Sequence, residues 1–142
     1  EGIHDDFNKF IWLDQDWNPE ATTEETALDY ANFFMSSKLA PLIAKGFFAL
    51  EENWNNPILN NQTVTNTFRL WQEIKDAASL SLESNYRFQM HFLRAVADYF
   101  IQSKHIFETE KVQQIENIIK ELVMVQFTRS TADWKPGMFL IK

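Results

Sequence analysis

Residues 85–102 constrain the fold more than any other segment of the chain. At helical spacing, the apolar side chains of this segment form two neighbouring stripes. One stripe contains Tyr86, Met90, Leu93, Ala97 and Phe100, and the other contains Phe88, Phe92, Val96 and Tyr99. A helix that is apolar around most of its circumference must be surrounded by other elements. We therefore predict an all-α fold, a single domain of about five to six helices packed as an irregular bundle around a central helix near residues 85–104.

A polar seam runs along one edge of this predicted helix. It contains Arg87, His91, Arg94 and Asp98, which helical spacing places in a row. Charged groups gathered in this way sometimes mark functional sites. An Arg94–Asp98 pair is more often a structural device that docks a loop or a neighbouring helix, and we favour that interpretation of the seam.

Composition limits the classes of function that the chain can have. With 142 residues and 45% hydrophobic content it can form one domain with a substantial core. Aromatic residues make up 15%, whereas there are only 3 Gly and 4 Pro, which favours packed helices over a turn-rich β-sandwich. The formal charge of −7 repels nucleic-acid phosphates, and the apolar runs are too short to span a bilayer. We predict neither a nucleic acid nor a membrane as a partner.

Several kinds of catalytic site are missing from the sequence. Without cysteine, the chain cannot form disulfides, thiolate zinc sites or cysteine nucleophiles. It has no glycine-rich phosphate loop, no histidine pair at metal-binding helical spacing and no serine nucleophile elbow. The Glu-x-x-His order of di-iron bundles occurs at Glu1 to His4, where a single match is expected by chance. We therefore predict no metal, no cofactor and no catalytic residue in the chain itself.

Further helices are expected on both sides of the central one. Apolar spacing predicts a helix over about residues 4–13, and Thr22 with Glu25 forms a capping box for the next. The remaining predicted features are a Ser36-Ser37 cap before a helix to about Glu52, an Asn60 or Asn61 cap before a helix over about residues 64–78, a break at 79–84, and a last helix to about Phe127. Residues 16–20 are predicted to be a loop, because Pro19 holds Asn18 out of the helical region.

Two places outside the seam have side chains with chemical potential. His4, Asp5 and Asp6 combine an imidazole with carboxylates, a combination that can bind a metal or move a proton. Acidic residues at a helix N-terminus are also expected from the helix dipole, and we favour that explanation. Trp54, in an asparagine-rich loop, could stack on a sugar face, although a Trp in such a loop more often plugs the gap between two helices.

Short motifs in a fixed order give the chain a resemblance to one kind of protein. The motifs are Glu1-Gly2-x-x-Asp5-Asp6-x-Asn8-Lys9, Trp17-Asn18-Pro19, Asp29-Tyr30-Ala31, Leu50-Glu51-Glu52-Asn53-Trp54 with Pro57, and Asn85-Tyr86-Arg87-Phe88-Gln89 with Arg94-Ala95 and Asp98. Through them, residues 1 to 110 resemble the C-terminal helical region of large bacterial glycoside-hydrolase-like proteins of the α-glucuronidase-like type, which have a (β/α)-barrel upstream. The chain departs from that pattern at Tyr86 and at Val96-Ala97.

The resemblance implies a division of the chain and a set of ligand-binding candidates. Residues 1–15 would be the junction with an upstream catalytic barrel, 16–127 the helical domain, and 128–142 a tail that docks on the domain or on a neighbour. The chain starts with Glu1 instead of Met, which fits a piece of a longer protein. The location would be extracytoplasmic, either periplasmic or secreted. The ligand-binding candidates are Glu1, Asp5, Asp6, Trp17 and Trp54.

Two functions of different classes follow. The first, which we prefer, is a non-catalytic helical C-terminal domain of a polysaccharide-degrading glycoside hydrolase that braces the barrel and shapes its cleft; the isolated chain should show no turnover. The second is an autonomous helical module that binds a protein or a carbohydrate through exposed Trp12, Trp17, Trp54 and Trp134. The first predicts an apolar patch near the N-terminal helix, and the second a compact monomer with one groove.

Overall fold

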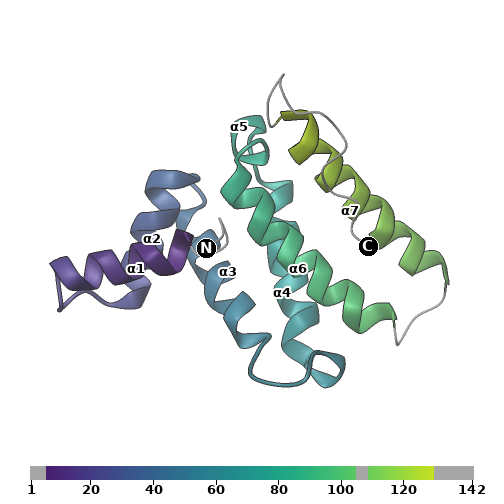
Figure 1. Cartoon of the computed structure of the whole chain (residues 1–142), viewed down its shortest axis with the longest axis horizontal. Coiled ribbons are helices and arrows are strands. Elements are labelled where there is room, and N and C mark those ends of the chain that lie inside the picture. The colour runs from purple at the N-terminus through teal and green to yellow at the C-terminus, as the bar shows by residue number, and fades with distance from the viewer. Residues whose placement is uncertain (1–5, 105–108, 130–142) are drawn as a thin grey trace.

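A computed structural model describes residues 6–104 and 109–129 of the chain (Figure 1). These residues form seven α-helices and one 3-10 turn, and no strand occurs among them. The elements are α1 (Asp6–Trp17), α2 (Thr23–Phe34), α3 (Ala40–Glu52), η2 (Ile58–Asn60), α4 (Gln62–Asp76), α5 (Leu80–Glu83), α6 (Tyr86–Lys104) and α7 (Thr109–Arg129). The predicted all-α bundle is confirmed. The helix beyond the expected five to six is α5, a single turn in the stretch predicted to be a break.

The helix predicted to be central, α6, lies in the middle of the bundle. It packs against α3, α4, α5, α7 and the η2 turn. Figure 1 shows α4 and α6 in the centre, α7 on one side and the pair formed by α1 and α2 on the other. The α1–α2 pair joins the bundle chiefly through α3, because α2 packs on α3 and α3 packs on α4.

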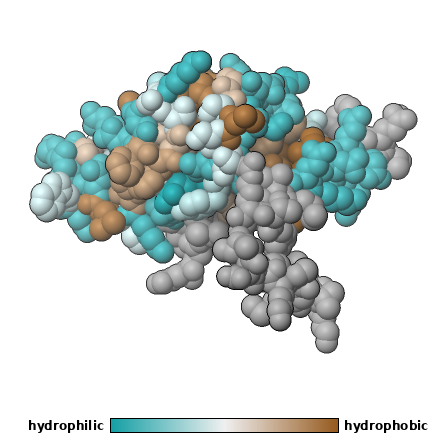
Figure 2. Space-filling model, turned by 90° about the horizontal axis from the view of Figure 1, so that it is seen from above, coloured by the Kyte–Doolittle hydropathy of each residue, from teal (hydrophilic) through white to brown (hydrophobic). Residues whose placement is uncertain are grey.

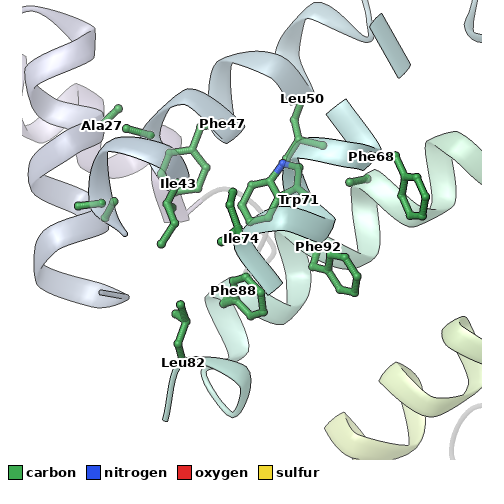
Figure 3. Close-up of a cluster of buried hydrophobic side chains, with 14 of the residues drawn as sticks. Ala27, Ile43, Phe47, Leu50, Phe68, Trp71, Ile74, Leu82, Phe88 and Phe92 are labelled. Carbon is green, nitrogen blue, oxygen red and sulfur yellow. The ribbon is translucent and has the colours of Figure 1, made fainter. Parts of the chain in front are cut away.

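The core is centred on Trp71 of α4, whose side chain is fully buried (Figure 3). Its indole Nε1 donates a hydrogen bond to the carbonyl oxygen of Gly46 in α3, at 3.2 Å. Phe47 and Phe88 contact the indole from α3 and α6, with ring centroids 6.1 Å away in both cases. Large rings from three helices thus meet at one point, which fixes how α3, α4 and α6 cross.

Local sequence signals explain where two helices begin. The Thr22 hydroxyl accepts from the backbone N–H of Glu25 at 3.2 Å, while the Glu25 carboxylate accepts from the backbone N–H of Thr22 at 3.0 Å. This is the predicted capping box. Asn61 caps α4 through its side-chain oxygen, which accepts from the Thr63 backbone N–H at 3.0 Å. One of the two predicted alternatives is therefore confirmed.

Three local predictions are wrong. Helix α1 continues to Trp17 instead of ending near residue 13, because Pro19 restricts only the residue before it and the Asn18 N–H still bonds to Asp14 at 2.7 Å. Helix α3 begins at Ala40 without a side-chain cap; Ser36 instead accepts weakly from the Leu39 N–H, at 3.4 Å, one turn earlier. The third concerns Trp54, which was predicted to plug the gap between two helices. Its side chain is instead 70% exposed.

The last helix, α7, packs on α6. Ile115 is buried, and Ile118, Ile119 and Leu122 pack against the core from the same face. Helix α1 also belongs to this core, because Phe7 and Phe10 pack against it. The boundary predicted between residues 15 and 16 therefore falls inside α1. The tail beyond residue 129 and the candidates Glu1, His4, Asp5 and Trp134 lie outside the described residues.

Candidate functional site

The four residues of the polar seam on α6 each contact a different part of the molecule. Arg87 reaches α1 and α2, Arg94 reaches the end of α3, and Asp98 reaches the loop that follows α3. The expected Arg94–Asp98 ion pair does not form, because each side chain has a partner outside α6. The seam joins the helices and loops around α6.

Arg87 forms the first of these contacts, a cluster with Asp6 and Tyr30. Its Nε donates to the Asp6 carboxylate at 2.6 Å and approaches the Tyr30 hydroxyl at 3.1 Å. The Tyr30 hydroxyl donates to the same Asp6 oxygen, at 2.9 Å. The Arg87 guanidinium also lies 4.3 Å from the ring centre of Phe34, a cation–π distance. Three side chains from α1, α2 and α6 are thereby fixed together.

The electrostatics of this cluster suit a structural contact. Burial raises the pKa of Tyr30 far above its ordinary value, and the Asp6 carboxylate raises it further. For Arg87, desolvation lowers the pKa, but the bonds to Asp6 and Tyr30 outweigh it and the net pKa is raised. Tyr30 stays neutral and Arg87 stays charged at ordinary pH. Neither side chain is poised to exchange protons near neutrality.

His91 is half-buried between aromatic rings. Its Nδ1 is 2.7 Å from the backbone oxygen of Arg87, one turn earlier in α6. The imidazole ring stacks almost parallel to Trp71 at a centroid distance of 5.8 Å, and the Phe47 ring is 4.7 Å away. His91 therefore forms part of the aromatic core around Trp71.

Arg94 links α6 to the end of α3. Its guanidinium donates to the Glu51 carboxylate at 3.1 Å and to the Leu50 backbone oxygen at 3.2 Å. The same guanidinium lies 5.5 Å from the Trp54 ring centre. Both members of the Arg94–Glu51 pair are partly exposed, so the pair adds little stability by itself. Its clearer effect is to hold the Arg94 guanidinium over an exposed indole, with Glu51 as the ion-pair partner of Arg94.

Asp98 belongs to a buried polar network that sequence analysis did not predict. Its carboxylate accepts from the Asn53 side chain at 2.9 Å, and the Asn53 amide oxygen accepts from the Thr67 and Thr63 hydroxyls at 3.0 and 3.2 Å. On the next turn, Gln102 donates to the backbone oxygens of Ile58 and Asn61 at 2.7 and 2.8 Å. The network fixes the 53–61 loop to α4 and α6.

The stripe of α6 that starts at Tyr86 is not fully surrounded. Together with Phe7, Tyr30 and Arg87, its residues line an open hollow of about 210 Å³ between α1, α2 and α6. The stripe residues in the hollow are Tyr86, Met90, Leu93 and Ala97. The other stripe is the buried one, with Phe88, Phe92 and Val96 in the core. The prediction that both stripes are enclosed is therefore wrong for the first.

The ligand-binding candidates within the described residues do not form one site. Asp6 is held by Arg87 and Tyr30, Trp17 is 91% exposed at the end of α1, and Trp54 is exposed in the loop after α3. Figure 1 places the end of α1 and the loop after α3 at different edges of the molecule. Sequence reasoning missed Asn53 and Glu51 as partners of the seam, although both precede Trp54 in the motif that contains it.

The described residues contain no metal site and no membrane span, and the chain has no matching relative. Within residues 6–104 and 109–129, no three His, Cys, Asp or Glu side chains come close enough together to hold a metal ion. None of the described helices has the length and apolar character needed to cross a bilayer. No model of a protein family, no curated protein and no solved structure matches the chain.

Proposed function

We propose that the chain is a non-catalytic helical domain of a larger polysaccharide-degrading glycoside hydrolase, where it braces the catalytic barrel and shapes one wall of its cleft. One structural observation carries the bracing role: α1 presents a row of large apolar side chains to solvent. The nature of the partner rests on the resemblance of the sequence motifs to glycoside-hydrolase-like proteins.

The exposed face of α1 consists of Trp12, Leu13 and Trp17. Their side chains are 70%, 69% and 91% exposed, whereas Phe7 and Phe10, in the first half of the helix, pack against the core. At helical spacing Leu13 and Trp17 lie on the same side of α1 as Phe10, about one and two turns further along, so the second half of the helix exposes apolar side chains where the first half packs them against the core. Figure 2 shows apolar and near-neutral residues among hydrophilic ones on the side of the molecule where α1 and α2 lie.

Such a face favours contact with another surface. Burying a side chain the size of Leu gains about 1.5 to 3 kcal/mol, so leaving three of comparable or larger size in water is a substantial cost. Apolar residues concentrated on one helix commonly mark an interface. A barrel attached ahead of residue 1 would join the chain a few residues from α1, within reach of this face.

The way α1 is held also supports a bracing role. The Asp6–Arg87–Tyr30 cluster fixes one end of α1 to α2 and α6, and the rings of Phe7 and Phe10 lie 5.3 Å from the Tyr30 ring. A helix that binds a partner domain must itself be packed firmly on the rest of its own domain. The use of the Asp6 carboxylate in this cluster agrees with a structural role for that residue.

A second candidate function is an autonomous binding module. Trp54 favours it, because an exposed indole next to Arg94, which is paired with Glu51, provides both stacking and hydrogen bonding. An autonomous module would need no partner domain in the same polypeptide, which distinguishes it experimentally from a bracing domain.

The size of the native gene product separates the two candidates. An antibody raised against the chain would be used to blot an extract of the source cells, with the recombinant 16.8 kDa chain as the marker. We expect a band several times heavier than the marker. A single band at the marker position would refute the bracing domain and leave the autonomous module.

The docking face would then be tested in the heavier protein. We expect Trp12→Gln, Leu13→Gln and Trp17→Gln combined to accelerate proteolytic cleavage between the barrel and the helical domain, because the interface would lose its apolar contacts. Leu80→Gln is the matched control, since Leu80 is 84% exposed but lies on α5. Equal cleavage in the triple variant, the control and the unmodified protein would show that α1 does not contact the barrel.

A further inference from the structure

The loop after α3 holds one aromatic side chain out of the protein at a fixed position. Trp54 is 70% exposed, whereas Asn53 immediately before it is only 1% exposed. A large indole at the surface of a marginally ordered loop would be unremarkable. Here the adjoining residue is one of the most buried polar groups in the described part of the chain, so the loop cannot move freely.

Hydrogen bonds on both sides of Trp54 restrict the loop. The Asn53 side chain bonds to Asp98 on α6 and to Thr63 and Thr67 on α4, and its backbone oxygen accepts from the Asn61 side chain at 3.0 Å. The Trp54 backbone N–H donates to the backbone oxygen of Glu51 at 3.0 Å, continuing the last turn of α3. Binding of a ligand to the indole would therefore cost little conformational entropy in the loop.

Charged groups stand beside the indole in a defined geometry. The Arg94 guanidinium lies over one face of the Trp54 ring, 5.5 Å from its centre, and is held by the Glu51 carboxylate and by the Leu50 backbone oxygen. The Glu51 side chain remains 65% exposed, so its carboxylate can still accept hydrogen bonds from outside. One patch thus combines an aromatic face, a donor and an acceptor.

We propose that Trp54, Arg94 and Glu51 form a binding subsite for one neutral pyranose ring of a polysaccharide. A pyranose has an apolar C–H face, which packs on the indole face that Arg94 does not cover, and a rim of hydroxyl groups that extend past the edge of the indole and both donate and accept hydrogen bonds. The Glu51 carboxylate accepts from one hydroxyl and the Arg94 guanidinium donates to another. A uronic acid fits less well, because its carboxylate would approach that of Glu51 on a chain of formal charge −7.

This subsite is separate from the α1 docking face. In Figure 1 the loop between α3 and α4 lies at the lower edge of the molecule, while α1 extends toward the left edge. Sugar binding at Trp54 and barrel docking at α1 can therefore succeed or fail independently. The same separation provides a matched control residue, since Trp17 is an exposed indole at the other position.

The test is a titration of the ¹⁵N-labelled chain with xylohexaose, cellohexaose and maltohexaose, followed through the five tryptophan indole N–H signals. We expect at least one of these neutral oligosaccharides to shift the Trp54 signal while the Trp17 signal stays in place. Trp54→Ala should weaken binding at least about tenfold, as truncation of an aromatic anchor does. Trp17→Ala should bind like the unmodified chain, and Glu51→Gln should bind more weakly.

Three results would overturn the proposal. The first is no shift of the Trp54 signal by any of the three oligosaccharides up to millimolar concentration. The second is an equal loss of affinity in Trp17→Ala and Trp54→Ala, which would indicate non-specific contact with exposed indoles. The third is tighter binding of oligogalacturonate than of any neutral probe. Circular dichroism of each variant would establish that the helices are retained.

Discussion

Replacing Gly46 with alanine provides the sharpest test of the core. Gly46 lies in the interior of α3 against Trp71, and a Cβ atom added there would be 2.9 Å from the Cε2 and Cζ2 atoms of the indole. Carbon atoms pack well at about 3.5 to 4.0 Å, so the ring or the helix would have to move. The indole is fully buried and donates a hydrogen bond to the Gly46 oxygen, which leaves it little freedom to do so.

Opposing terms decide the sign of the effect. Alanine is favoured over glycine by about 1 kcal/mol in a helix interior. Overpacking a well-filled core costs about 1 to 3 kcal/mol. Displacing the indole also weakens its hydrogen bond to Gly46, worth about 1 kcal/mol. We therefore expect Gly46→Ala to lower the free energy of unfolding by about 1 to 3 kcal/mol, although helix propensity alone predicts an increase.

Urea unfolding followed by helical circular dichroism would measure this change through the shift of the midpoint. Lys45→Ala is the control for the same helix, because Lys45 is exposed and its replacement should change stability by no more than about 0.5 kcal/mol. Trp71→Phe removes the indole atoms that the new methyl group would meet. In that background Gly46→Ala should be stabilising, since only the higher helix propensity of alanine over glycine remains.

Two outcomes would refute this reasoning. One is a Gly46→Ala variant that is more stable than the unmodified chain, which would mean that the indole does not pack against the Gly46 backbone. The other is an unchanged cost of Gly46→Ala in the Trp71→Phe background, because the two sites would then be independent.

Four further predictions test the polar contacts. Asn53→Ala should lower the free energy of unfolding by about 2 to 3 kcal/mol in urea unfolding, because it leaves the buried Asp98 carboxylate without its amide partner. Ser103→Ala should raise stability by up to about 1 kcal/mol in the same assay, since the buried Ser103 hydroxyl has no hydrogen-bond partner among residues 6–104 and 109–129. Arg87→Gln should speed amide hydrogen exchange in α1 while exchange in α4 changes little, because the cluster fixes α1 to α6. Burial and the Asp6 carboxylate raise the folded-state pKa of Tyr30. The stability that this group contributes is therefore complete below its unfolded pKa of about 10 and should decline as the pH rises above that value. Tyr30→Phe should remove the decline in a pH series of melting temperatures.

Signals carried within one stretch of sequence predicted the structure best. The period of α6, the Thr22–Glu25 box and the Asn61 cap depend on residues within a few positions of one another, and each occurs as expected. The prediction of where α1 ends was wrong, because Pro19 restricts the backbone of Asn18 only.

Contacts between distant segments were not predictable in the same way. Arg87 and Asp6 are 81 positions apart, and Arg94 and Glu51 are 43 apart. The spacing on α6 indicated that Arg94 and Asp98 share a helix edge, but partners supplied by other elements decided how each is used. A pair four positions apart on a helix gains only about 0.5 kcal/mol, which the carbonyl of Leu50 and the amide of Asn53 readily outcompete.

Trp71 and Trp54 show why residue type alone does not determine burial. Trp71 faces a glycine, so its indole can lie directly against the α3 backbone and bond to a carbonyl there. Beside Trp54, the interior position is taken by Asn53, whose amide satisfies Asp98 and two threonine hydroxyls; an indole has only one donor and could not replace it. The polar network therefore excludes Trp54 from the gap that it was predicted to fill, and the same network anchors the residue immediately before it. The exposure of Trp54 and its suitability as a binding platform thus have a single physical cause.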